Sequence, residues 1–183
     1  MTALGGAARD SIDHAMPGMV GRGVLLDIAR LNGLDWLEVD HVIEPSELEE
    51  AERRQGVRVG EGDALLFRTG WRKKAVVEGW TGWLDANPGL SMSCAEWLHA
   101  RGVSSVISDN WAIEVQPGRE EGATLPLHCI LIRDMGMMFG ELFNLEELAD
   151  DCADDGQWDF LLSAPPLRVT GAVGSPVSPI AIK

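Results

Sequence analysis

The apolar residues of this chain fall into short runs that glycines, prolines and charged residues separate. Five runs have the length and composition of buried strands, and they cover residues 21–30, 63–70, 103–110, 137–143 and 158–169. Several segments between these runs carry helix signals. Strands that alternate with helices in this way are typical of an α/β fold.

Four segments have the boundary residues of helices. Residues 44–56 place a proline in the first turn, acidic residues early and basic residues late. Residues 91–102, 126–135 and 144–156 combine a capping residue with a glycine just after the last turn. The predicted caps are Ser91 or Ser93, Thr124 and Asn144, and the predicted stops are Gly56, Gly102, Gly136 and Gly156. Residues 71–89 have no clean period, so we expect a long loop there.

The length of the chain limits the number of domains. A chain of 183 residues with 45% hydrophobic content can bury one good core and leaves little for a second. We therefore expect a lead segment over residues 1–20 and a single α/β domain over residues 21–183.

Charge and cysteine content narrow the classes of partner. The 29 acidic residues outnumber the 15 basic residues, which gives a net charge of −14 and a pI near 4.5. Such a chain repels phosphate backbones and anionic lipids, so nucleic acid and membrane surfaces are poor partners. No apolar run approaches the ~18–20 residues that a membrane helix needs, and the N-terminus lacks a signal-peptide pattern. Three widely spaced cysteines suit reduced thiols, so we expect a cytoplasmic protein.

Candidate chemistry centres on one histidine. No nucleophile elbow, P-loop, dinucleotide fingerprint or zinc-protease motif occurs. Of the four histidines, His128 alone lies in an apolar segment, and Glu141 follows it on the next predicted strand. Such a pair can bind a metal or transfer protons. A buried histidine that is hydrogen-bonded to a carboxylate for structural reasons fits the same residues equally well.

Two other groups of residues are candidates for a site. Asp109 and Asn110 end a predicted strand, where α/β proteins place polar site residues, and a turn-forming pair is the alternative. Trp71, Trp80 and Trp83 can line a substrate pocket, although large aromatic residues more often cover the edge of a core.

Six blocks of sequence, spread over nearly the whole chain, form a distinctive set. They are GRGVLLDIARLNGLDWLE, GDALLFRTGW, SDNWAIE, LPLHCILIRDMGM, GELFNLEELA and APPLRVTGAVGSPVSPIAIK. In this order they resemble the cyclase family of metal-dependent hydrolases, which includes bacterial kynurenine formamidase and isatin hydrolase. The resemblance implies an α/β fold around a mixed, barrel-like sheet flanked by helices, assembled as dimers or tetramers. It also implies the opening of an amide or lactam, with Zn²⁺ or Mn²⁺ polarising the carbonyl group and activating water.

The resemblance also implies an incomplete set of metal ligands. The family motif H-x-G-T-H-x-D-x-P-x-H, or its Trp-Asp-x-x-x-His variant, lies upstream of a GRGVLLD-like strand, and residues 1–20 contain neither form. His128 and Glu141 match the later His and Glu of the family, so these two residues are the expected ligands. Catalytic zinc sites usually have three protein ligands, so we expect Zn²⁺ or Mn²⁺ to be weakly bound or absent.

These observations predict a cyclase-family hydrolase that acts on a small amide or lactam, in a natural-product or aromatic catabolic pathway. The expected catalytic residues are His128 and Asp109, and the expected substrate-binding residues are Asn110, Trp111 and Trp71. The missing ligands would come from another polypeptide, an upstream segment, or substrate and solvent. A degenerate homologue that acts as a binding or assembly partner, and a metal-independent acid–base cyclase, are the alternatives. We also expect a homo-oligomer, with a full-length relative as a further candidate partner.

Overall fold

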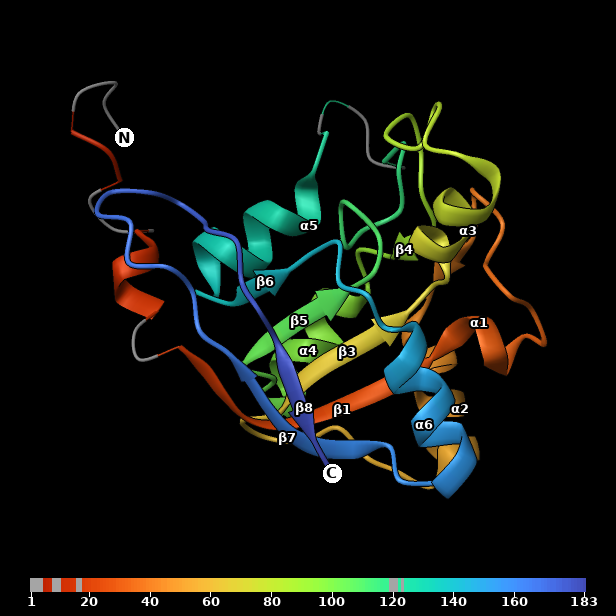
Figure 1. The fold of residues 1–183 in the computed structure, drawn as a ribbon. Coiled ribbons are helices and arrows are strands. Elements are labelled where there is room, and N and C mark those ends of the chain that lie inside the picture. The colour runs from red at the N-terminus through yellow and green to blue at the C-terminus, as the bar shows by residue number, and fades with distance from the viewer. Residues whose placement is uncertain (1–4, 8–10, 16–17, 119–121, 123) are drawn as a thin grey trace.

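A mixed six-stranded sheet, in the order β6–β5–β3–β1–β7–β8, forms the centre of the computed structural model (Figure 1). The structure describes residues 5–7, 11–15, 18–118, 122 and 124–183. Strands β1, β3, β5 and β6 are parallel, β7 is antiparallel to β1, and β8 is antiparallel to β7. The strand bounds are β1 Met19–Asp27, β3 Ala64–Arg68, β5 Ser105–Ser108, β6 Met138–Gly140, β7 Asp159–Ala164 and β8 Ile180–Ile182. Two short strands, β2 Val42–Ile43 and β4 Gly89–Leu90, pair in parallel beside it.

Helices cover both faces of the sheet. They are α1 Ile28–Leu31, α2 Pro45–Gln55, α3 Trp71–Glu78, α4 Cys94–Arg101, α5 Pro126–His128 and α6 Glu146–Asp155. A 3₁₀ turn spans Ile12–Ala15, and a π-helical segment, Cys129–Asp134, continues α5. None of the helices within the described residues is both long and apolar enough to cross a membrane. The predicted arrangement, a central mixed sheet flanked by helices, is therefore confirmed.

The alternation of side chains along β1 divides the core into two layers. Val24 and Leu26 pack with the buried residues of α2 and α4, whereas Leu25 packs with Ala149 and Cys152 of α6. Successive side chains of a strand point to opposite faces, so a run that is apolar at every position must be covered on both sides. This explains the unbroken apolar runs at residues 24–26 of β1 and 64–67 of β3, which precede the buried charged residues Asp27 and Arg68.

Four of the local predictions were wrong. Residues 71–78 form α3 instead of a loop, and the exposed Val76 and Val77 explain why no helical period was visible there. Leu125 and Leu145, rather than Thr124 and Asn144, occupy the N-cap positions of α5 and α6, and neither side chain accepts a capping hydrogen bond. The predicted strand over residues 137–143 is β6, which ends at Gly140 and so leaves Glu141 beyond the strand.

The described strands form an open row whose last member, β8, lies at the C-terminal end of the chain (Figure 1). Ile182 lies opposite Leu161, and Ile180 lies opposite Ser163, which itself pairs with Val20. All four of the apolar side chains in these two rows are exposed, at 47–61% of their full area. The edge of the sheet thus carries a small apolar surface, made by Val20, Leu161, Ile180 and Ile182.

We expect this surface to be covered in a homo-oligomer, because apolar side chains that cluster on an edge strand favour association. Light scattering over a concentration series should give a mass above the 19.8 kDa of one chain. The double variant Ile180→Lys/Ile182→Lys should shift the mass toward the monomer. The variant Val76→Lys/Val77→Lys, on the exposed side of α3, is the control. A wild-type mass of one chain throughout would contradict the expectation.

A buried guanidinium group joins the carboxyl ends of β1 and β3 to the start of α6. Arg68, 4% exposed, donates from Nη1 to Oδ1 of Asp27 at 2.9 Å. It also forms a two-pronged pair with Glu146, through Nε at 2.9 Å and Nη2 at 2.8 Å. A further bond from Nη2 reaches the carbonyl oxygen of Asp35 at 3.0 Å. The planar fork of arginine fits this set of acceptors, and a lysine could not satisfy them together.

Removal of Arg68 should therefore destabilise the fold strongly. Arg68→Ala should lower the free energy of unfolding by about 3–5 kcal/mol, because buried Asp27 would lose its buried partner and keep only the partly exposed Arg30. Arg68→Lys should also lower it, because one ammonium group cannot replace all four bonds of the guanidinium group. The control Arg54→Ala breaks an exposed ion pair with Glu50 and should change the free energy of unfolding by less than about 1 kcal/mol. Denaturant unfolding measures both values. Equal effects of the two alanine variants would refute the structural importance of this network.

Candidate functional site

His128 lies between two carboxylates that come from different parts of the chain. Its Nδ1 lies 2.8 Å from Oε1 of Glu114, which belongs to the loop after β5. Its Nε2 lies 3.2 Å from Oε1 of Glu141, the residue after β6. The ring of Phe139 meets the imidazole edge to face, with the centroids 4.9 Å apart. The structure thus confirms that His128 and Glu141 are in contact and adds Glu114 as a second partner.

Glu114 is held more firmly than Glu141. Only 4% of the Glu114 side chain is exposed, against 31% for Glu141. Besides the imidazole, the carboxylate of Glu114 accepts the backbone N–H groups of Leu127 at 3.2 Å and His128 at 2.9 Å. These N–H groups open the helical segment that begins at Pro126 and have no partner within it. Glu114 therefore fixes the imidazole ring and the backbone that carries it.

The environment of His128 favours its charged form. Burial lowers the pKa of the imidazole, but the hydrogen bonds with Glu114 and Glu141 and the charges of both carboxylates outweigh this effect. The net result is a pKa raised to about 9. Below that pH both ring nitrogens carry protons, and each proton points to a carboxylate.

Two glycines allow the chain segments that carry Glu114 and Glu141 to pack closely against their neighbours. A Cβ atom on Gly89 of β4 would clash with the backbone of Ile113 and Glu114, so the loop after β5 can lie there only against a glycine. A Cβ atom on Gly140 would lie 2.8 Å from the ring of Phe143 and 2.9 Å from Ile107. Larger residues at these two positions would therefore push Glu114 and Glu141 away from the imidazole.

Asp109 and Asn110 lie at the carboxyl end of β5, as predicted, but their side chains bond to the backbone and to Thr69. Oδ1 of Asp109 accepts the N–H group of Thr69 at 2.8 Å and its hydroxyl group at 2.7 Å. Burial raises the pKa of this fully buried carboxyl group, and the bonds from Thr69 oppose the shift. The amide of Asn110 bonds to Pro88 and Ile113. The structure therefore does not bring Asp109 into contact with His128, and the predicted catalytic and binding roles of this pair stay predictions.

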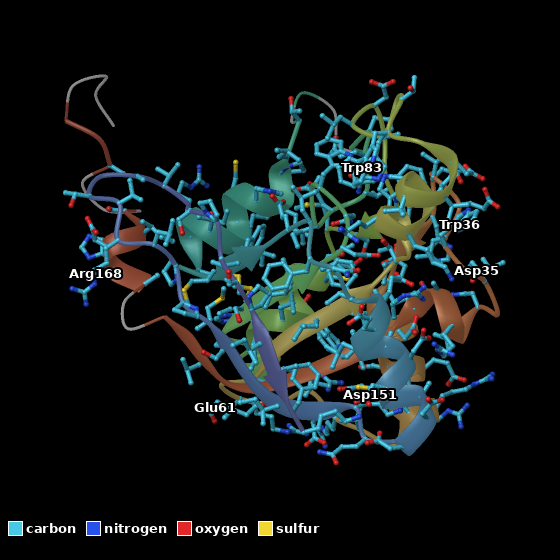
Figure 2. All side chains as sticks on the ribbon, viewed as in Figure 1. Asp35, Trp36, Glu61, Trp83, Asp151 and Arg168 are labelled. Carbon is cyan, nitrogen blue, oxygen red and sulfur yellow. The ribbon has the colours of Figure 1, made fainter. Side chains whose placement is uncertain are left out.

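The tryptophans form a separate group over α3. Trp71 and Trp83 are almost fully buried and exchange bonds from each indole N–H to the backbone carbonyl of the other, at 3.4 and 3.1 Å. The half-buried Trp111 packs against them, and its Nε1 atom is buried without a protein partner among the described residues. Figure 2 labels Trp83 on the side of the molecule that carries α3. Trp71 is thus part of a small buried cluster with Ala75 and Trp83. The binding roles predicted for Trp71 and Trp111 stay predictions.

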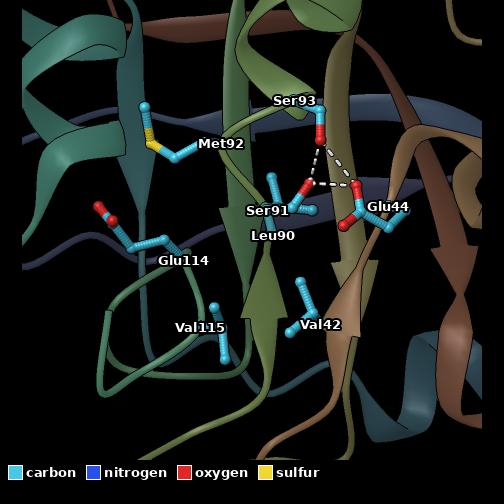
Figure 3. Close-up of a pocket in the computed structure, with 8 residues that line it drawn as sticks. All are labelled: Val42, Glu44, Leu90, Ser91, Met92, Ser93, Glu114 and Val115. Carbon is cyan, nitrogen blue, oxygen red and sulfur yellow. Dashed lines mark hydrogen bonds between the residues drawn. The ribbon is translucent and has the colours of Figure 1, made fainter. Parts of the chain in front are cut away.

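A pocket of about 170 Å³ borders the site (Figure 3). Its walls are Val42, Glu44, Leu90, Ser91, Met92, Ser93, Glu114 and Val115. At one side the hydroxyl groups of Ser91 and Ser93 donate to Oε2 of Glu44, each at 2.7 Å (Figure 3). At the other side lies Glu114, the partner of His128. The pocket thus reaches the residue that orients the imidazole.

The donors in this cluster fit part of a metal site. His128 and Glu141 offer one nitrogen and one oxygen, the donor types that zinc accepts. Among the residues that the structure describes, however, no three His, Cys, Asp or Glu side chains gather closely enough to hold a metal ion. The geometry therefore brings together one nitrogen and one oxygen donor, and the predicted role of His128 and Glu141 as metal ligands stays a prediction.

Comparison with known proteins identifies the family. The model of the Cyclase family, described as "Putative cyclase", matches residues 3–115, which is more than half of the chain. The chain belongs to the cyclase family. The matched range includes Glu114 and ends before His128 and Glu141. None of the curated proteins matches the chain.

Several solved structures share this fold. A structure described as a novel cyclase is 37% identical with a TM-score of 0.86, and the match covers 94% of this chain and 57% of that one. Isatin hydrolase A from Ralstonia solanacearum is 23% identical with a TM-score of 0.74, covering 94% and 64% of the two chains. A potential metal-dependent hydrolase with cyclase activity is 16% identical with a TM-score of 0.60, covering 89% and 65%. This chain therefore spans less than two thirds of the length of each of these relatives.

The charged imidazole should make stability depend on pH. The folded-state pKa of about 9 exceeds the ordinary value of 6.5, so the contribution of His128 is complete below pH 6.5 and is lost as pH rises through 9. The loss should be on the order of 2 kcal/mol, given the partial exposure of the ring. Denaturant unfolding of wild type and His128→Gln across this range measures it. The difference between the two proteins should shrink at high pH, and His99→Gln, on exposed α4 surface, is the control.

A constant difference between wild type and His128→Gln from pH 6.5 to pH 9 would contradict this expectation, because it would mean that the two carboxylates do not stabilise the imidazolium form.

Proposed function

We propose that this chain carries part of the active site of a hydrolase that opens a small amide or lactam by breaking its C–N bond. The observation that carries the proposal is the placement of His128, whose Nδ1 is held by Glu114 while Nε2 faces Glu141. A carboxylate on one ring nitrogen is the usual means of orienting an imidazole whose other nitrogen binds a metal. Membership of the cyclase family and the likeness to an isatin hydrolase support this choice of reaction.

His128 and Glu141 would hold the metal ion of such a site, together with ligands from another polypeptide, from residues outside this pair, or from substrate and water. Zn²⁺ or Mn²⁺ bound there would polarise the amide carbonyl group and lower the pKa of a bound water molecule. The two residues alone leave most of the coordination sphere to water, so the chain by itself should bind metal weakly.

The residues of this chain would prepare the site and move protons. Glu114 fixes the imidazole through three hydrogen bonds, two of them from backbone N–H groups. Nε2 of His128 must lose its proton before it can act as a ligand, and Glu141, at 3.2 Å, is placed to accept it. With 31% of its side chain exposed, Glu141 can pass that proton on to solvent and then serve as a ligand in its ionised form.

A second function is favoured by the direct contact of Nε2 with Glu141. A charged imidazole that is hydrogen-bonded to a carboxylate is an acid–base couple in its own right. We keep a metal-independent cyclase or isomerase as this alternative. Its activity would survive a chelator, whereas the activity of the metal-dependent hydrolase would not.

The purified chain alone should bind Zn²⁺ or Mn²⁺ with low occupancy and hydrolyse N-formylkynurenine or isatin-like substrates poorly or not at all. If a full-length relative supplies the missing ligands, mixing the two proteins should raise metal content and amide hydrolysis together. His128→Ala should abolish the gain, because it removes the nitrogen ligand, and His99→Ala should keep it. Metal analysis after desalting and hydrolysis rates measure these outcomes.

Stoichiometric metal and ordinary turnover from this chain alone would show that its ligands differ from the two residues named. Turnover that a chelator leaves unchanged would instead favour the acid–base alternative.

A further inference from the structure

Each carboxylate that contacts His128 lies next to a residue with an unusual backbone conformation. Ile113, which precedes Glu114, has a φ of 55°, and Leu142, which follows Glu141, has a φ of 64°. Within the described part of the chain these two are the only residues other than glycine with a positive φ. For a β-branched residue such as Ile113 this conformation is especially unfavourable, so surrounding contacts must impose it.

A single residue, Asn110, bonds to both of these turns. Its Oδ1 accepts the N–H group of Ile113 at 3.0 Å. Its backbone carbonyl oxygen accepts the N–H group of Leu142 at 2.9 Å. The side-chain Nδ2 donates to the carbonyl oxygen of Pro88 at 2.7 Å, which ties the whole arrangement to the segment before β4.

The side-chain amide of Asn110 bonds to backbone groups at both ends. The residue is fully buried. Its own N–H group lies 3.3 Å from the hydroxyl oxygen of Ser108, and the carbonyl oxygen of Ser108 accepts the N–H group of Phe143 at 3.1 Å. The end of β5 therefore fixes the segment after β6 at two successive points.

We propose that Asn110 is a positioning residue that sets the places of Glu114 and Glu141 on the two ring nitrogens of His128. The side chain holds the turn at Ile113 directly, and so it controls the bond between Glu114 and Nδ1. The backbone carbonyl group of Asn110 holds the turn at Leu142. The side chain affects this second bond only indirectly, because its bonds to Pro88 and Ile113 fix the position of residue 110. This assignment concerns the arrangement of the cluster and holds whichever reaction the site performs.

The isosteric variant Asn110→Asp provides the sharpest test. It keeps the shape and volume of the side chain but replaces the Nδ2 donor by a carboxylate oxygen that faces the carbonyl oxygen of Pro88. A role in filling space would survive this change, whereas a role in hydrogen bonding would not. Asn32→Asp is the matched control, because Nδ2 of Asn32 likewise donates to a backbone carbonyl, that of Ile28, and also donates to Glu47, which contacts His41.

The measurement is proton exchange by NMR in ¹⁵N-labelled protein, in which only four histidines contribute imidazole signals. His128→Gln assigns the signal of His128. In Asn110→Asp the proton on Nδ1 of His128 and the amide proton of Ile113 should exchange at least about tenfold faster, the change expected when a buried hydrogen bond is lost. The proton on Nε2 should change less. In Asn32→Asp the signals of His41 should change and those of His128 should not.

If the Nδ1 proton of His128 and the amide proton of Ile113 exchange at unchanged rates in folded Asn110→Asp, the proposal is overturned. Asn110→Ala removes the same side-chain bonds without adding a charge, and it should give the same result if the aspartate variant does not fold. The unmodified chain supplies a test that needs no variant. The amides of Ile113 and Leu142 should be as strongly protected from exchange as the amide of Val106 in β5, and unprotected amides there would also overturn the proposal.

Discussion

The buried polar residues at the carboxyl ends of β1, β3 and β5 are the constraint on which the rest of the structure depends. Asp27 and Arg68 end two neighbouring strands, and their ion pair lies inside the protein, with side-chain exposures of 1% and 4%. Such a pair is tolerated only when every charge and donor has a partner. Glu146 completes the set, and this requirement fixes where α6 begins.

The position of α6 in turn limits the segment that carries Glu141. Only residues 141–145 connect the end of β6 to α6, and Phe143 and Leu145 are buried in the layer under that helix. Glu141 therefore has little freedom along the sheet. Asp109, one strand further, adds its own buried bonds to Thr69, the residue after Arg68. The ends of the parallel strands form one connected polar layer, and the cluster around His128 lies beyond it.

The site itself is made by contacts between distant parts of the sequence. Glu114, His128 and Glu141 come from a loop, a short helix and the residue after a strand, and each glutamate lies next to a residue with a positive φ. Irregular segments of this kind are common where a fixed geometry serves a function. The family match ends at residue 115, so two of the three residues lie outside the matched range, and the structure connects them to it through Glu114.

The sequence by itself determined the elements whose signals are local. The apolar runs predicted the main strands, and Pro45, Gly56 and Gly102 marked helix ends that the structure confirms, because these residues have backbone preferences that do not depend on neighbours. It also singled out His128 and Glu141, since a histidine in an apolar segment needs a partner. Only the tertiary structure decided that Glu114 is the second partner and that Asn110 bonds to the turns beside both carboxylates. Glu114, the last residue of the block SDNWAIE, is a weak sequence indication of this second partner. Its contact with His128 depends on a loop that packs against Gly89. A hydrogen bond between residues far apart in sequence depends on how strands and loops pack, and the local pattern of a chain does not contain that information.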